Sequence, residues 1–181
     1  MSFFLLLSFQ LYFLIFIVIY RNNFVTIKRC SFAEFINFRN ERSSEDTLRF
    51  EPPGRHFPSA DEEIKFWKDE VLSGNYLIYS IYDINEDPVG FISAFSFDKS
   101  KRECESGIVI FPKSNWNKGY AFNAYNLFFD ILKYKYSIIS VFICTTLINK
   151  SSIKLFEKLG FKKSNEYDDA GMRWIKMILF L

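Results

Sequence analysis

Residues 116–134, WNKGYAFNAYNLFFDILKY, join a polar turn to a long apolar run. The run predicts a helix, and Gly119 and Ala121 lie where the backbone would enter it. The first N–H groups of a helix have no partner inside it, and the helix dipole places partial positive charge at the same end. The stretch therefore predicts a phosphate or pyrophosphate site, to which Lys113 and Lys118 would add charge. On these residues alone, the alternative of a turn glycine before a core helix stays open.

The composition is that of one folded domain. The 181 residues are 49% hydrophobic and 20% aromatic, which is enough for a sizeable core. The formal net charge of +2 indicates no concentrated basic face, so nucleic acid is not an expected partner. Cys30, Cys104 and Cys144 are widely spaced and form neither a disulfide framework nor a metal-binding pair. His56 is the single histidine, so no metal site is expected.

Residues 3–20 are almost wholly apolar, and no charged residue precedes Arg21. A helix of this length would measure about 27 Å, close to the lower limit for crossing a bilayer. The basic residues that follow would keep the rest of the chain in the cytoplasm. We therefore expect a hydrophobic segment over residues 1–22, which would associate with a membrane, and a cytoplasmic domain over residues 23–181. A buried hydrophobic helix and a non-native extension are the alternatives.

The pattern of the remaining chain predicts seven strands and four helices. Capping boxes at Ser31 and Ser59 open two of the helices. Residues 42–58 are polar and rich in Pro, Gly and Ser, which predicts a long loop. Residues 137–146 are a continuous apolar run, which predicts a strand buried on both faces. The order β-α-α-β-β-β-α-β-α-β-β indicates an α/β fold, in which helices flank a mixed and mostly antiparallel central sheet.

Two blocks of sequence carry a resemblance to a known family. In residues 105–121, ESGIVIFPKSNWNKGYA, the motif Q/R-x-x-G-x-G/A has Trp116, Gly119 and Ala121 at its fixed positions. Residues 149–161, NKSSIKLFEKLGF, follow the pattern N-x-x-[AS]-x-x-L-[YF]-E-K-x-G-F. Together the blocks resemble the GNAT superfamily of acetyl-CoA-dependent N-acetyltransferases. They look most like the branch that acetylates the N-termini of ribosomal proteins. Trp116 departs from the Q/R consensus, in a way that is familiar in that branch.

The resemblance implies acetyl-CoA as co-substrate and a primary amine as acceptor, joined in a ternary complex for direct attack. Backbone groups of the strand before the turn would pair with the pantetheine arm, and those of the turn would hold the pyrophosphate. The acceptor would be a protein N-terminus or a small amine such as a polyamine, an amino sugar or an antibiotic, recognised by residues 42–58 and the next helix. A monomer or a homodimer is expected. The cofactor-binding residues implied are Ile108, Val109, Ile110, Trp116, Asn117, Lys118, Gly119, Tyr120, Ala121, Asn149 and Ser152.

Glu105 is the candidate general base. It precedes Trp116 by eleven residues, and some family members place their base carboxylate at about this spacing. A carboxylate needs an apolar environment or a water relay to act as a base near neutral pH. The alternative is an exposed strand residue balanced by Lys101 or Arg102.

The proton donor for the leaving thiolate is not evident. Many family members carry a tyrosine in the second block, but Phe156 stands at that position and has no proton to donate. Ser152 lies one helical turn earlier and is the candidate to hydrogen-bond the sulfur. An alternative function is a domain that binds acyl-CoA or a partner protein without turnover.

Overall fold

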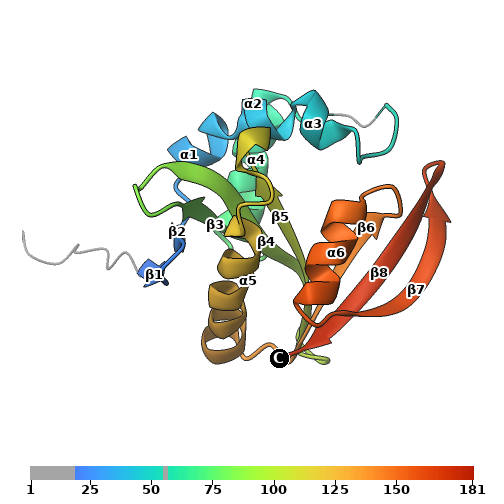
Figure 1. Ribbon diagram of the computed structural model, residues 1–181. Helices are drawn as coiled ribbons and strands as arrows, with labels where there is room; N and C mark the ends of the chain where they lie inside the picture. Colours follow the sequence, from blue (N-terminus) through green and yellow to red (C-terminus); the bar gives the residue numbers. More distant parts are fainter. Residues whose placement is uncertain (1–18, 55–56) are drawn as a thin grey trace, which may run out of the picture.

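Eight strands form one mixed sheet in the computed structural model, which describes residues 19–54 and 57–181 (Figure 1). The strands are β1 (Ile19–Arg21), β2 (Thr26–Arg29), β3 (Leu77–Tyr82), β4 (Pro88–Asp98), β5 (Glu103–Ile110), β6 (Ser140–Thr146), β7 (Lys162–Asp169) and β8 (Met172–Phe180). They lie in the order β1-β2-β3-β4-β5-β6-β8-β7. Neighbours are antiparallel except β5 and β6, which are parallel. The predicted mostly antiparallel sheet flanked by helices is confirmed.

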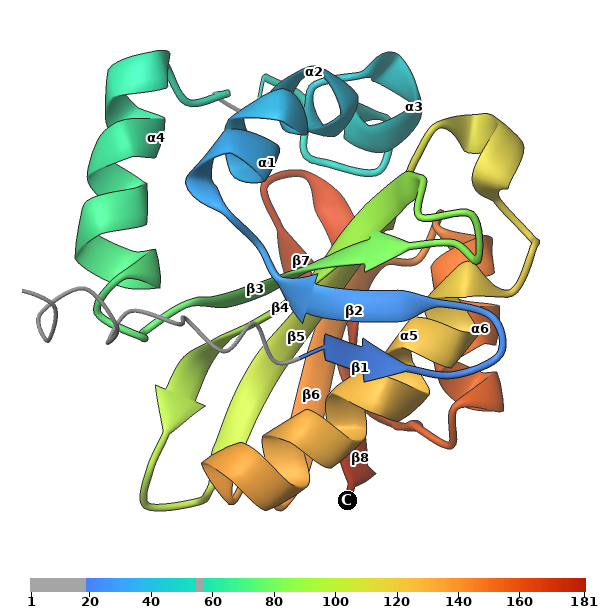
Figure 2. The same cartoon turned by 90° about the vertical axis from the view of Figure 1, so that its left-hand side faces the viewer.

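The helices form two groups on opposite faces of the sheet, with α4 on one side and α5 and α6 on the other (Figure 2). The first group is α1 (Phe32–Asn37), α2 (Arg39–Arg42), α3 (Glu45–Leu48) and α4 (Ala60–Phe66), the last continued by a π-helical turn, η1 (Trp67–Val71). The second is α5 (Tyr120–Asp130), continued by the π-helical turn η3 (Ile131–Lys135), and α6 (Lys150–Lys158). A short 3₁₀ turn, η2 (Lys113–Asn115), lies between β5 and α5.

Each group of helices packs aromatic rings against the sheet. Tyr125 and Phe128 of α5 and Phe156 of α6 are buried in the larger core. Phe35 of α1 and Trp67 of η1 are buried in a second core on the opposite face. Burial of a side chain of this size contributes about 1.5–3 kcal/mol, so these rings fix both helical layers to the sheet.

Both predicted capping boxes are present. The backbone N–H groups of Glu34 and Glu62 donate to the hydroxyl oxygens of Ser31 and Ser59, at 3.3 Å in each case. The two carboxylates accept in return from the backbone N–H groups of the serines at 2.7 Å. These reciprocal bonds explain why α1 and α4 begin where the sequence predicts.

The prediction of a long loop over residues 42–58 is wrong for the first part of this segment. α2 ends at Arg42 and α3 follows at once, and the hydroxyls of Ser44 and Thr47 both donate to the carbonyl oxygen of Glu41, at 2.8 and 3.0 Å. The prolines and glycine begin only at residue 52, so the residues before them are free to form helical turns.

The strand β1 is not predicted by the sequence pattern. Ile19 and Tyr20, which end the apolar segment, pair with Lys28 and Ile27 of β2, so the sheet begins before residue 23. The rest of the expected membrane segment lies outside the described residues. In residues 19–54 and 57–181, no helix has the length and apolar composition that crossing a bilayer requires.

Candidate functional site

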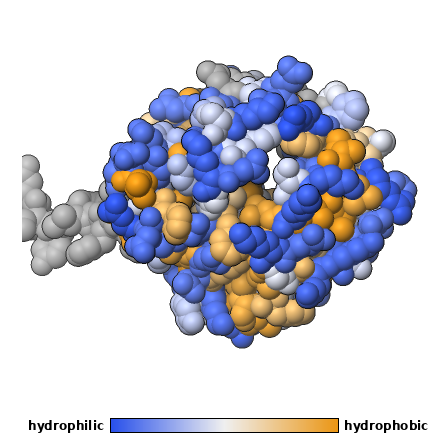
Figure 3. All heavy atoms as spheres, viewed as in Figure 1, coloured by the Kyte–Doolittle hydropathy of each residue, from blue (hydrophilic) through white to orange (hydrophobic). Residues whose placement is uncertain are grey.

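The parallel strands β5 and β6 separate after three residue pairs, the last of which joins Glu105 to Phe142. Beyond this point residues 106–110 pair only with β4, and residues 143–146 pair only with β8, among the strands that the structure describes. Each strand therefore presents one edge of backbone N–H and C=O groups to the space between them. Figure 3 shows a hollow in the surface between the two halves of the sheet. We call this space the cleft.

The turn before α5 lies near one side of the cleft mouth. Gly119 is the N-cap of α5 and has a φ of 87°, in the left-handed region that favours glycine. The first helical turn contains no acidic residue, so its unpaired N–H groups and the exposed Lys118 leave positive charge there. The indole Nε1 of Trp116 donates to the carbonyl oxygen of Ile110 at 2.7 Å, which fastens the turn to the end of β5.

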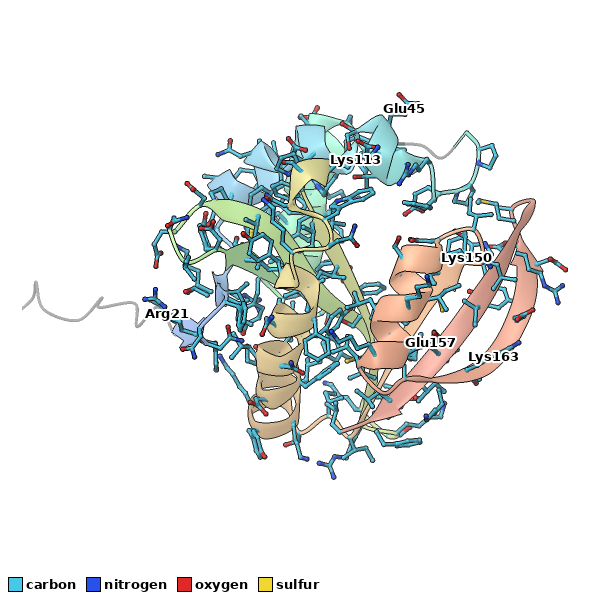
Figure 4. All side chains as sticks on the ribbon, in the orientation of Figure 1. Arg21, Glu45, Lys113, Lys150, Glu157 and Lys163 are labelled. Atoms are coloured by element: carbon cyan, nitrogen blue, oxygen red, sulfur yellow. The ribbon has the colours of Figure 1, made fainter. Side chains whose placement is uncertain are left out.

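The residues that the sequence assigns to the cofactor are divided between the two halves of the sheet. Residues 108–110 line the β5 edge, and the turn of residues 116–121 follows in the same half of the molecule. The other half contributes Asn149, whose Oδ1 accepts from the backbone N–H of Ser152 at 3.2 Å and so caps α6 as predicted. Figure 4 shows Lys113 in the half that carries the turn and Lys150, in the first turn of α6, across from it.

Phe156 belongs to the core. It is 3% exposed, and its ring contacts those of Tyr125 and Phe161 with centroid distances of 5.3 and 5.1 Å. The position at which many family members carry a hydroxyl is therefore filled by a packed apolar ring. Ser152, by contrast, is half-exposed on the first turn of α6.

Glu105 lies at the vertex of the cleft on the sheet face opposite α5. Its neighbours Cys104 and Ser106 point the other way, because both are buried and the Ser106 hydroxyl lies 3.3 Å from that of Tyr125 on α5. Burial raises the pKa of the half-buried Glu105 carboxyl, and the positive charge of Lys176 opposes that rise. This environment brings the carboxyl closer to the range in which a general base works.

The basic residues expected to balance Glu105 have other partners. Lys101 forms an ion pair with Asp98 at 3.1 Å, and Arg102 Nε donates to the carbonyl oxygen of Ser137 at 2.7 Å. The alternative of an exposed, balanced strand residue therefore does not describe Glu105.

Three residues near Glu105 escape the sequence analysis. Lys176 of β8 pairs across the sheet with Cys144 of β6, and the Lys176 ammonium lies 3.6 Å from the ring centroid of Phe142. Tyr167 of β7 lies within hydrogen-bonding reach of the Cys144 thiol. Phe142 and Cys144 are half-exposed, so the prediction that β6 is buried on both faces is wrong for this face. Only the strand order β6-β8-β7 reveals this cluster, and the sequence carries no direct signal of that order.

A cavity of about 350 Å³ lies between the N-terminal helices and the face of β3, β4 and β5 that Glu105 shares. Tyr76 lines it and stacks on Phe95, with centroids 5.1 Å apart, and Phe95 pairs with Glu105. Gly107 has no side chain between Glu105 and Val109 on this face, and the Ser93 hydroxyl and the Phe95 ring lie 3.6 and 3.8 Å from where its Cβ would be. The lining is mainly aromatic and acidic: Phe35, Phe57, Phe66, Tyr76, Phe91, Glu51, Glu62 and Glu63, with Arg42 as the counter-charge.

Solved structures that include acetyltransferases share this fold. The spermidine N-acetyltransferase from Vibrio cholerae, in complex with CoA and spermine, has a TM-score of 0.75 and 16% sequence identity, covering 88% of this chain and 96% of that chain. A domain from Methanocaldococcus jannaschii has a TM-score of 0.73 and 22% identity, and the match covers 87% of this chain and 98% of that chain. A probable acetyltransferase has a TM-score of 0.73 and 20% identity, and the match covers 90% of this chain and 97% of that chain. At these identities the likeness establishes the fold and leaves the acceptor open.

Comparison of the sequence with models of protein families assigns the chain to a family. No curated protein sequence matches it. The model of the acetyltransferase (GNAT) domain matches residues 26–162, which include the turn before α5 and the block that forms α6. The match does not distinguish the branch that acetylates ribosomal proteins, which stays a prediction. Because the match spans most of the sequence, the chain belongs to the GNAT family of acetyltransferases.

Proposed function

We propose that this protein is an acetyl-CoA-dependent N-acetyltransferase that transfers the acetyl group to a primary amine by direct attack. The observation that carries the proposal is the separation of β5 and β6 beside Glu105. It leaves an open backbone edge that runs from a half-buried carboxylate to a left-handed glycine turn. Such an edge suits an extended ligand with amide groups, and the turn suits a pyrophosphate, as acetyl-CoA requires.

Residues of both halves would hold acetyl-CoA. Backbone groups of residues 108–110 would pair with the pantetheine amides, as a strand pairs with the edge of a sheet. The N–H groups of residues 116–121 would bind the pyrophosphate. Asn149 and Ser152, at the start of α6, would contact the arm from the opposite side.

Glu105 would remove the proton from the acceptor ammonium, directly or through a water molecule. The neutral nitrogen then attacks the thioester carbonyl and a C–N bond forms. The C–S bond breaks, and the proton that the nitrogen loses as it becomes an amide passes to the departing CoA thiolate, which leaves as free CoA. Ser152 would donate a hydrogen bond to that sulfur, since Phe156 cannot. The raised pKa of Glu105 supports its role because a stronger base accepts the ammonium proton more readily.

The acceptor would extend from Glu105 into the cavity between the N-terminal helices and the sheet. Segment 42–58 and α4 supply much of the lining, which supports the expectation that they recognise the acceptor. Aromatic rings and carboxylates are suited to the body of an organic cation. A polyamine and a protein N-terminus are the acceptors that we propose to test, the first because a structural neighbour contains spermine and the second because of the resemblance to the ribosomal branch.

The test measures binding and turnover separately. Acetyl-CoA is titrated into the full-length protein by calorimetry, and free CoA is then followed with a panel of polyamines, other small amines and N-terminal peptides. Binding with turnover supports the transferase and defines its acceptor. Binding without turnover on the whole panel favours the non-catalytic acyl-CoA-binding module, for which Phe156 is the supporting observation. Absence of binding refutes the cofactor site.

A further inference from the structure

Trp116 stands where the family pattern has Gln or Arg, so this position has no cationic side chain beside the glycine turn. The indole is held in place by its hydrogen bond to the carbonyl oxygen of Ile110. A cation from elsewhere in the chain lies over its ring. The guanidinium carbon of Arg49, the residue after α3, is 5.2 Å from the ring centroid, a cation–π distance.

A second cation and one carboxylate complete this cluster. Lys113 of η2 lies 5.9 Å from the Trp116 ring centroid, and its ammonium pairs with Asp46 of α3 at 2.8 Å. Arg49 lies 3.8 Å from the same carboxylate. The side chains of Arg49, Asp46 and Lys113 are 44%, 40% and 56% exposed, so a ligand can reach all three. Asp46 thus places an anionic group between two cations beside the turn.

The segment that carries Arg49 contacts both halves of the sheet. It approaches the turn through Lys113 and Trp116, and the carbonyl oxygen of Phe50 accepts a hydrogen bond at 3.1 Å from the hydroxyl of Thr146, at the end of β6. Figure 1 places α3 beyond the ends of β5 and β6. Arg49 is therefore held near the path between the turn and the cleft.

We propose that Arg49 binds a phosphate group of acetyl-CoA and supplies, from the acceptor-binding segment, the positive charge that Trp116 lacks. The inference rests on the proposed function. The Trp116 ring supports the guanidinium from one side, and the planar donors of arginine suit phosphate oxygens. Asp46 would compete with the phosphate for Arg49 and Lys113. Since Leu48 and Glu51, on either side of Arg49, line the cavity, cofactor binding would also fasten one wall of the acceptor site.

Calorimetry with three variants of the full-length protein tests the proposal. Arg49→Gln should weaken acetyl-CoA binding about threefold to tenfold at low salt, because an exposed contact between a charged donor and a phosphate is lost. Asp46→Asn should have the opposite effect and tighten acetyl-CoA binding, because it removes an anion that competes with the phosphate. Arg173→Gln is the matched control, since Arg173 is 52% exposed and its guanidinium pairs with Asp168 in the β7–β8 hairpin. The affinity of the Arg173→Gln variant for acetyl-CoA should equal that of the wild type.

S-acetyl-pantetheine, which lacks the nucleotide phosphates, separates phosphate binding from a general effect on the site. Its affinity, measured by competition, should be the same for wild type and Arg49→Gln. Equal affinity of both proteins for acetyl-CoA overturns the role of Arg49 and leaves the proposed function intact. An equal loss for both ligands also overturns it, since Arg49 would then act by shaping the segment. Failure of the wild type to bind acetyl-CoA would instead reject the proposed function.

Discussion

Substitution of Gly119 by tryptophan tests the pyrophosphate site with a magnitude that the structure supplies. The φ of 87° costs a residue with a side chain about 1–2 kcal/mol. An added Cβ would meet Asn123 Nδ2 at 3.6 Å, an ordinary contact, so steric overlap at this atom adds little. A loss of this size lowers the Tm of a chain of this length by about 2–8 °C. The protein should therefore remain folded at 25 °C.

Binding should suffer more than stability. The indole would lie over the N–H groups of the first turn of α5, and each lost hydrogen bond to a charged group costs about 1.5–3 kcal/mol. The affinity for acetyl-CoA should therefore fall about tenfold or more. Gly171→Trp is the matched control, because Gly171 has a φ of 75°, has nothing within 4 Å of an added Cβ, and lies in the β7–β8 turn.

Thermal unfolding and calorimetric titration of the two variants give the decisive comparison. We expect similar losses of Tm and a loss of acetyl-CoA affinity for Gly119→Trp only. Unchanged affinity of a folded Gly119→Trp protein would refute the assignment of the turn. Equal loss of affinity in Gly171→Trp would show that destabilisation, rather than obstruction of the turn, reduces binding.

Three further substitutions test the base, its environment and the core. Glu105→Gln should lower kcat/KM at neutral pH by about 10²–10⁴-fold and leave acetyl-CoA affinity unchanged, and an unaltered pH–rate profile would remove Glu105 as base. Lys176→Met removes a positive charge that lowers the pKa of Glu105, so Glu105 should become protonated at a higher pH. The acid limb of the kcat/KM profile should therefore move to higher pH, whereas Lys163→Met should leave it in place. Phe128→Ala removes a fully buried ring and should reduce the free energy of unfolding in urea by about 3–5 kcal/mol, whereas truncation of the exposed Phe180 should change it by about 0.5 kcal/mol or less.

The features that could be predicted from the sequence are those that depend on neighbouring residues. The capping boxes at Ser31 and Ser59, the glycine turn at Gly119 and the cap at Asn149 each need only a few adjacent residues. The strands after residue 76 could be predicted for the same reason, because the alternation of apolar and polar residues and the turn residues determine their bounds. Together these local signals were enough for the fold class.

The features that escaped prediction depend on which strands become neighbours. Lys176 influences Glu105 only because β8 lies beside β6, and Arg49 meets Trp116 only because α3 lies near the turn. Neither contact has a signal in the chain, since Lys176 lies 71 positions after Glu105. Membrane association through residues 3–20 stays a prediction that fractionation of the full-length protein can test.

The open edges of β5 and β6 explain why the site lies at this point of the sheet. Unpaired edges are usually a liability, because they can pair with another chain. Here the two halves are braced at the base by the contact of Tyr125 with Phe156, and at the mouth by the bond of Thr146 to Phe50. A cleft held open in this way needs little rearrangement before it accepts a ligand, so less of the binding free energy is lost to ordering. An extended molecule with amide groups would satisfy the edges at low cost, and under the proposed function this preorganisation would favour acetyl-CoA over ligands without such groups.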